Sequence, residues 1–299
     1  MDFVVTVDRL PSPGETVLGR DFRMIPGGKG ANQACAAGKL GGDSVAVKLI
    51  GRVGCDVFAD HLKASLAAAG VDVTAVHATR AQPTGVALIC VDRQGQNSIV
   101  VASGANHELA AADVEAMRKS FRGAAVALFQ LETPLATVEA ALKIAREEGA
   151  ITILDPAPAQ RLGPGLLAQV DILTPNESEA LVLCARAPAR VSLDEARPLA
   201  ESLRRLGPPT VILKLGDQGC FLLNETGPRH FPAYAVEVRD TTAAGDTFNA
   251  ALAVALAEGR RIVEAIPFAN AAAAISVTRL GAQASAPTRG QVEELMRGA

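Results

Sequence analysis

The sequence predicts an α/β protein built on a doubly wound, mostly parallel sheet with helices on both faces and a small β-sheet lid. Short apolar, β-branched runs alternate with helical stretches along most of the chain, as βα units do. Two pairs of strand-like runs near the N-terminus interrupt this alternation. The 299 residues are 49% hydrophobic and 3% aromatic, so Ala, Val and Leu supply a sizeable core.

The parallel sheet is expected from runs that are typical of buried strands, at 45–50, 126–131, 151–155, 170–174 and 211–215. Helices are expected between and after them, several ending at a glycine, over 57–69, 109–122, 134–148, 178–184, 194–206, 246–258, 262–280 and 288–297. Such alternation favours a sheet covered on both faces, which binds ligands at the carboxyl ends of its strands.

The two interruptions predict a lid over that edge of the sheet. Residues 3–7 and 16–25 form one expected hairpin, and 86–91 and 97–101 form another across the turn at 92–96. The chain has no long linker, repeat or low-complexity tract beyond its alanine richness. We therefore expect one domain over 1–299, with the lid taken from about 3–25 and 85–102.

Composition excludes several functional classes. A net charge of −3 provides no basic stripe for nucleic acid. The five cysteines are scattered without a C-x-x-C pair, which is typical of reduced thiols in the cytosol and not of a disulfide frame or zinc site. No apolar run approaches ~18 residues, and Asp2 and Asp8 argue against a signal peptide. We expect a cytoplasmic protein that binds neither nucleic acid nor membrane.

The segment at 240–246, DTTAAGD, opens an alanine-rich apolar helix. Ala243, Ala244 and Gly245 leave backbone N–H groups unshielded, and the first turn of a helix has unpaired donors and roughly half a positive charge. This combination favours binding of an anion such as a phosphate in transit. Asp246 would lie where a hydroxyl must lose its proton, although a plain N-cap explains this aspartate equally well from the segment alone.

A second segment at 26–33, PGGKGANQ, leads into another alanine-rich helix. It lacks the spacing of a Walker A loop, and the chain has no G-x-G-x-x-G turn. The glycines could serve a flexible turn or close helix packing. Their combination with Lys29, Asn32 and Gln33 instead favours recognition of a polyhydroxyl ligand.

The two segments together resemble the two signatures of the PfkB-type sugar kinases, and the chain is most similar to the ribokinase group of that family. Further matching segments follow in order: 13–17 (PGETV), 84–89 (TGVALI), 104–106 (GAN), 130–132 (QLE), 155–159 (DPAPA), 174–177 (TPNE) and 271–285. The resemblance implies a ribokinase-like fold and ATP-dependent phosphorylation of D-ribose at its 5-hydroxyl. A kinase of deoxyribose or another small sugar, and a non-catalytic sugar- or nucleotide-binding relic, stay open as alternatives.

The resemblance also implies the catalytic and sugar-binding residues. Asp246 is the general base, and the amides from Ala243 through Ala244 and Gly245 to Asp246 stabilise charge on the transferred phosphoryl group. The sugar is bound by Asp2, Gly28, Lys29, Gly30, Ala31, Asn32, Glu132 and Asp246. Asp2 and Glu132 could be ordinary surface carboxylates, but Glu132 follows an apolar run at the carboxyl edge, which favours function.

The remaining implied residues bind nucleotide and metal. ATP is bound by Asn176, Lys214, Leu215, Gly216, Asp217, Gln218, Gly219, Gly245 and Asn270. Glu179 contacts Mg²⁺ through water, although a capping box explains the same Asn-x-x-Glu spacing. Activating K⁺ is bound by Asp240, Thr242, Ser276, Arg279, Gly281 and Ser285. The resemblance further implies a homodimer that pairs through its lids, since an isolated lid is marginally stable.

Three features depart from the family pattern. Family members carry a first strand that ends in an Asn two residues before the sugar-binding Asp, and no such strand precedes Met1 and Asp2. A sheet without it would have unpaired backbone groups, so we expect either a misplaced start codon or a damaged protein. Asn270 stands where His is common near the adenine, a mild change. Ala243 replaces the usual Gly of the signature.

Overall fold

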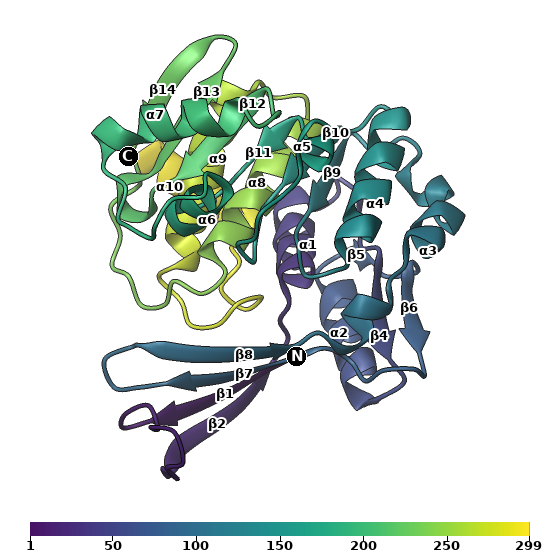
Figure 1. The fold of residues 1–299 in the computed structure, drawn as a ribbon, viewed down its shortest axis with the longest axis vertical. Coiled ribbons are helices and arrows are strands. Elements are labelled where there is room, and N and C mark those ends of the chain that lie inside the picture. The colour runs from purple at the N-terminus through teal and green to yellow at the C-terminus, as the bar shows by residue number, and fades with distance from the viewer. Residues whose placement is uncertain (299) are drawn as a thin grey trace.

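The computed structural model describes residues 1–298 and shows a layered α/β body from which a β lid projects (Figure 1). The main sheet has six strands in the order β14-β13-β12-β11-β10-β9. Its parallel strands are β9 (Val126–Phe129), β10 (Ile151–Leu154), β11 (Ile172–Leu173) and β12 (Thr210–Lys214). The antiparallel strands are β13 (Cys220–Asn224) and β14 (Gly227–Phe231). The predicted fold class is confirmed.

Helices cover both faces of this sheet because apolar side chains alternate along its strands. In β12, Ile212 lies in the cluster of one face, and Val211 and Leu213 lie in the cluster of the other. The first face carries α1 (Lys29–Gly41), α8 (Ala244–Ala257), α9 (Ile262–Ser276) and α10 (Arg289–Gly298). The second face carries α4 (Leu135–Glu147), α5 (Pro164–Leu167), α6 (Glu177–Leu183) and α7 (Leu193–Arg204).

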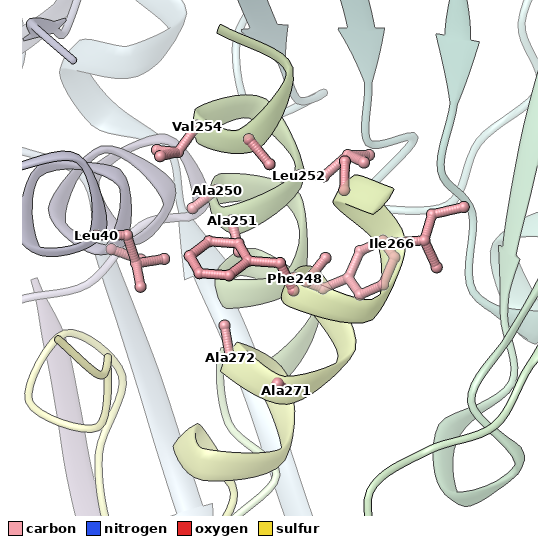
Figure 2. Packing of buried hydrophobic residues seen from close by; sticks show 14 of the residues in the cluster. Leu40, Phe248, Ala250, Ala251, Leu252, Val254, Ile266, Ala271 and Ala272 are labelled. Carbon is pink, nitrogen blue, oxygen red and sulfur yellow. The ribbon is translucent and has the colours of Figure 1, made fainter. Parts of the chain in front are cut away.

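Alanines let the helices of the first face approach closely. Figure 2 shows Phe248 and Ala251 of α8 packed between Leu40 of α1 and Ala272 of α9, and all four side chains are buried. Dense packing of this kind resists displacement of its members. The position of α8, and with it the position of its first turn, is therefore fixed on both sides.

Two parallel strand pairs lie apart from the main sheet. β3 (Val47–Lys48) pairs with β5 (Val71–Asp72), and β4 (Gly51–Gly54) pairs with β6 (Val76–Thr79). α2 (Val57–Ala68) connects β4 to β5 along the chain, whereas α3 (Ala111–Ala116) packs against α4. Strand β9 forms the edge of the six-stranded sheet. The additional first strand that the family resemblance implies has no counterpart among residues 1–298.

The lid contains both predicted hairpins. Its four strands run in the order β2-β1-β7-β8. The antiparallel hairpins β1–β2 and β7–β8 are joined because β1 and β7 pair in parallel. The strands are β1 (Asp2–Val7), β2 (Gly19–Ile25), β7 (Val86–Val91) and β8 (Asn97–Ala102).

Several predicted boundaries were wrong. The strand expected at 45–50 is only the two-residue β3, and the separate strand β4 follows it. The helix expected over 109–122 is α3 followed by the 3₁₀ turn η2 (Arg118–Phe121). The helix expected to reach 280 ends at Ser276. Hairpin β13–β14 was missed, because β13 is buried at every position and β14 is a mostly exposed edge strand, so neither alternates cleanly.

Candidate active site

The predicted site residues gather where the N-termini of α1 and α8 meet the carboxyl ends of β9, β10 and β12. Asp246, in the first turn of α8, is 5% exposed. Asn32 Nδ2 donates to Asp246 Oδ2 at 3.0 Å, and Gln33 Nε2 donates to Asp246 Oδ1 at 2.9 Å. Two segments that are distant in the sequence thus meet at this carboxylate.

The environment of Asp246 suits a general base. Burial raises the pKa of Asp246, while the charge of Lys29 and the amide donors from Gln33 and Asn32 act in the opposite direction. The N-cap of α8 is Ala243, and both Asp246 oxygens accept from α1 side chains. The alternative that Asp246 is merely an N-cap is therefore wrong.

The first turn of α8 offers two free donors. No hydrogen bond within residues 1–298 uses the amides of Gly245 and Asp246, whereas the Ala244 amide donates to the Thr241 carbonyl at 3.3 Å. Ala243 has φ 58° in the left-handed region, which costs a non-glycine residue roughly 1–2 kcal/mol. Such backbone strain is concentrated at functional sites. The predicted anion site thus has Gly245 and Asp246 as its principal donors.

The glycine segment before α1 is needed for close approach. A Cβ on Gly27 would lie 2.0 Å from Asp2 Oδ2, and Gly28 has φ 93°. The Lys29 amide donates to Glu132 Oε2 at 2.8 Å. These contacts bring Asp2, the start of α1 and Glu132 together.

The carboxylates of Asp2 and Glu132 are not ordinary surface groups. Burial raises the pKa of Asp2 and also that of Glu132. Burial alone would lower the pKa of Lys29, but the neighbouring carboxylates, with Asp246 the strongest, raise it overall. Gln130 Oε1 lies 3.1 Å from where a Cβ on Gly30 would be, and Ala31 packs against the buried cluster that contains Leu66 and Val71.

The first residues expected to bind nucleotide and Mg²⁺ lie at the start of α6. Asn176 and Glu179 form a capping box at α6, in which the Glu179 amide donates to Asn176 Oδ1 at 2.9 Å and the Asn176 amide donates to Glu179 Oε2 at 2.8 Å. Glu179 is also buried, and burial raises its pKa. The capping explanation therefore holds, and it leaves a buried carboxylate beside the site.

The turn after β12 requires its glycines. Gly216 and Gly219 have φ 56° and 85°, and a Cβ on Gly219 would lie 2.1 Å from the Phe231 carbonyl oxygen. Asn270 Nδ2 donates to the Pro232 carbonyl at 3.0 Å. The turn that includes η3 (Gly216–Gln218), the end of β14 and α9 therefore lie together.

The two predicted potassium loops lie against each other. The Asp240 amide donates to the Val277 carbonyl at 3.1 Å, and the Gly281 amide donates to Asp240 Oδ2 at 2.8 Å. Ser276 and Ser285 are fully buried, and each hydroxyl donates to a carbonyl three residues earlier. No cluster of three or more His, Cys, Asp or Glu within residues 1–298 could hold a metal. Carbonyl and hydroxyl oxygens of this kind fit a monovalent cation.

Sequence reasoning pointed to Gln33 but gave no site role to two further polar residues, Gln130 and Asp155. Gln33 Nε2 donates to Asp155 Oδ2 as well as to Asp246, and Gln33 Oε1 accepts from Gln130 Nε2. Asp155 is 2% exposed. Its position directly after an apolar strand was the available signal, since the same position singled out Glu132.

Comparison with known proteins now identifies the family. Residues 1–289 match the profile described as pfkB family carbohydrate kinase. The chain belongs to this family. The ribokinase of Haemophilus influenzae is 41% identical over 299 residues, which cover 100% of this chain and 96% of that protein.

Solved structures agree with the assignment of this chain to the carbohydrate kinase family. The Thermotoga maritima ribokinase has a TM-score of 0.88 at 39% identity, covering 99% of this chain and 96% of that one. The Arabidopsis thaliana ribokinase, solved with ribose and ATP, has a TM-score of 0.89 at 33% identity, covering 99% and 95%. The kinase therefore has the ribokinase-like fold. No helix within its residues 1–298 is long and apolar enough to span a bilayer.

Proposed function

We propose that this carbohydrate kinase transfers the γ-phosphoryl group of ATP to the 5-hydroxyl of D-ribose, giving D-ribose 5-phosphate and ADP. The observation that carries the proposal is the buried Asp246 carboxylate, fixed by Asn32 and Gln33 beside the two free amides of α8. A sugar-binding relic would have no need of a buried base there. The relatives named ribokinase support ribose and ATP as the substrates.

The chemistry follows from this placement. Asp246 accepts the proton of the sugar hydroxyl as its oxygen attacks the γ-phosphorus, a contribution of roughly 10²–10⁴-fold. The Gly245 and Asp246 amides stabilise the negative charge that develops on the γ-phosphoryl oxygens. Asp2, Asn32 and Glu132 hold the sugar so that its hydroxyl faces the base.

The nucleotide is bound along Asn176, the turn of residues 214–219 and Asn270. Carboxylates outnumber lysines in the site, so an anionic nucleotide requires a cation beside it. Buried Glu179 would hold Mg²⁺ through water, and this ion would neutralise charge on the nucleotide phosphates.

The five cysteines are free thiols, which supports a location in the reducing cytoplasm.

The substitution Glu132→Gln tests whether Glu132 binds the sugar. The carboxamide oxygen can still accept from the Lys29 amide, but its NH₂ group replaces the oxygen left for a sugar hydroxyl. We expect the ribose KM to rise at least about tenfold, the effect of losing a hydrogen bond to a charged group. The ATP KM should stay within about twofold.

The same assay separates the candidate sugars. Wild-type turnover with ATP should be faster for ribose than for 2-deoxyribose, fructose or adenosine, measured as ADP release. Faster turnover of 2-deoxyribose would replace ribose by that sugar. Equal rises of both KM values in Glu132→Gln would remove Glu132 from the sugar pocket.

We propose further that K⁺ activates the enzyme. The loop that contains Asp240 leads into the first turn of α8, and Gly281 donates to Asp240, so an ion bound between these loops would fix the anion site. Turnover should therefore fall when K⁺ is replaced by tetramethylammonium at constant ionic strength. Equal turnover in the two salts would remove potassium from the proposal.

The lid supports a two-fold homodimer. The pairing register places Phe3, Phe22, Met24, Leu88 and Val100 on one face of the lid, while Asp2 lies on the other. Phe22, Met24, Leu88 and Val100 are each more than half exposed. A contiguous apolar face of this kind is typical of an interaction site, and a second lid has the matching chemistry.

The paired variant Leu88→Glu with Val100→Glu should make the protein monomeric by light scattering at micromolar concentration, because it would bury carboxylates in the lid contact. Leu193→Glu, an exposed leucine substituted at the start of α7, is the matched control and should leave the dimer intact. A wild-type monomer under these conditions would contradict the assembly.

A further inference from the structure

The ATP-binding role expected for Lys214 explains neither its ion pair with Asp155 nor which part of the nucleotide it contacts. Lys214 Nζ donates to Asp155 Oδ1 at 2.9 Å, and the two side chains are 13% and 3% exposed. Taking two charges out of water is unfavourable, and such a pair stabilises a fold no better than apolar side chains of the same size. Its presence at the carboxyl edge of the sheet therefore points to a task in the site.

The ammonium group of Lys214, the last residue of β12, lies next to the first turn of α8. A Cβ on Gly245 would be 3.3 Å from Lys214 Nζ, so the ammonium group is next to the residue whose amide is free. A lysine ammonium has three N–H donors. Only the bond to Asp155 occupies this group within residues 1–298. Unused donors of Lys214 and of the helix thus lie side by side.

Asp155 links Lys214 to Asp246 through Gln33. Its second oxygen, Oδ2, accepts from Gln33 Nε2 at 2.9 Å, and the same Nε2 donates to Asp246 Oδ1 at 2.9 Å. The Gln33 amide cannot turn over freely because Gln130 Nε2 donates to its oxygen. The positions of Lys214 and Asp246 are therefore set by one shared network.

We propose that Lys214 binds the transferred phosphoryl group directly and that Asp155 is the positioning residue that holds Lys214 there. The inference rests on the phosphoryl transfer proposed above. In that step the sugar oxygen bonds to the γ-phosphorus, the bond from this phosphorus to the β–γ bridging oxygen breaks, ADP leaves, and the hydroxyl proton goes to Asp246. Lys214 and the amides of Gly245 and Asp246 neutralise charge on the γ-phosphoryl oxygens meanwhile.

Lys214→Met tests the contact with the γ-phosphoryl group. Affinities for ADP and for the β,γ-methylene analogue of ATP are measured by calorimetry with Mg²⁺. The analogue should bind at least about tenfold more weakly, because a charge-assisted bond to its γ-phosphoryl group is lost, and ADP binding should stay within about twofold. The kcat should fall by about 10²-fold.

Lys143→Met, an exposed lysine substituted on α4, is the matched control and should change none of these values. Equal weakening of both nucleotides would overturn the proposal by placing Lys214 at the α- and β-phosphates. Unchanged affinity for the analogue would overturn it as well. Because the calorimetric measurements use no ribose, they stand even if the wild-type enzyme prefers another sugar.

A double-mutant cycle tests the positioning role. Asp155→Asn alone should lower kcat with little change in the ribose KM, but it should have no further effect in the Lys214→Met background. Additive effects of the two substitutions would contradict a role exerted through Lys214. The double variant carries neither buried charge, so it should fold and bind ADP even if Lys214→Met is destabilised by its unpaired carboxylate.

Discussion

Asp246→Asn is expected to lower kcat by about 10²-fold or more while the ribose KM changes little. The substitution keeps the shape of the side chain but removes its capacity to accept a proton. Burial raises the pKa of Asp246, so wild-type kcat/KM should rise with pH through a value above the usual aspartate range, as the carboxyl group loses its proton. This acid limb should be absent in the variant.

The fold should tolerate Asp246→Asn. One of the two donors that face Asp246 would meet an NH₂ group, but Asn32 Oδ1 is buried without a partner among residues 1–298. A flip of the Asn32 amide would turn this oxygen towards the new donor and restore the pairing. The melting temperature of the variant should therefore stay close to that of the wild type.

Asp194→Asn provides the matched control, since Asp194 is an exposed acidic residue in the first turn of α7. It should leave kcat unchanged, which separates loss of the base from loss of a helix-terminal charge. Near-normal turnover of Asp246→Asn would contradict the assignment of Asp246 as the general base.

Local chemistry made much of this site predictable from sequence. The 27–33 and 240–246 segments each begin a helix, and their small residues and polar side chains already indicate a sugar and a phosphate. Glu132 and the turn at 214–219 follow apolar strands, which places them at one edge of a parallel sheet. The alternation of strands and helices along the chain also predicted that helices cover both faces of the sheet.

The network that connects these segments was not predictable in this way. Gln33 meets Asp155 across 122 positions in the sequence, and Lys214 meets Asp155 across 59. Which polar groups pair depends on strand order and register, and neither is encoded in a local pattern. The parallel pairing of β1 with β7 was inaccessible for the same reason, since each strand alone indicates only its own hairpin.

Gly245→Ala is expected to separate stability from activity. Gly245 is the second residue of α8, and its φ is not in the positive range, so alanine can adopt its conformation. Replacing a helical glycine by alanine stabilises a helix by roughly 0.5–1 kcal/mol. The melting temperature should therefore be unchanged or slightly higher in this variant.

Alanine keeps the backbone N–H of residue 245, but its methyl group would take up space beside the free amides, so kcat should nevertheless fall by about 10²–10³-fold, as much as when one donor to the developing charge is lost. The added methyl group would lie 3.3 Å from Lys214 Nζ and beside the free amides of the first turn. Gly259→Ala is an unsuitable control because Gly259 has φ 81°, whereas Gly290→Ala meets no neighbouring atom at the start of α10 and should leave kcat unchanged. If Gly245→Ala kept its turnover, the transferred phosphoryl group would not bind at this turn of α8. That result would also contradict the roles proposed for Asp246 and Lys214.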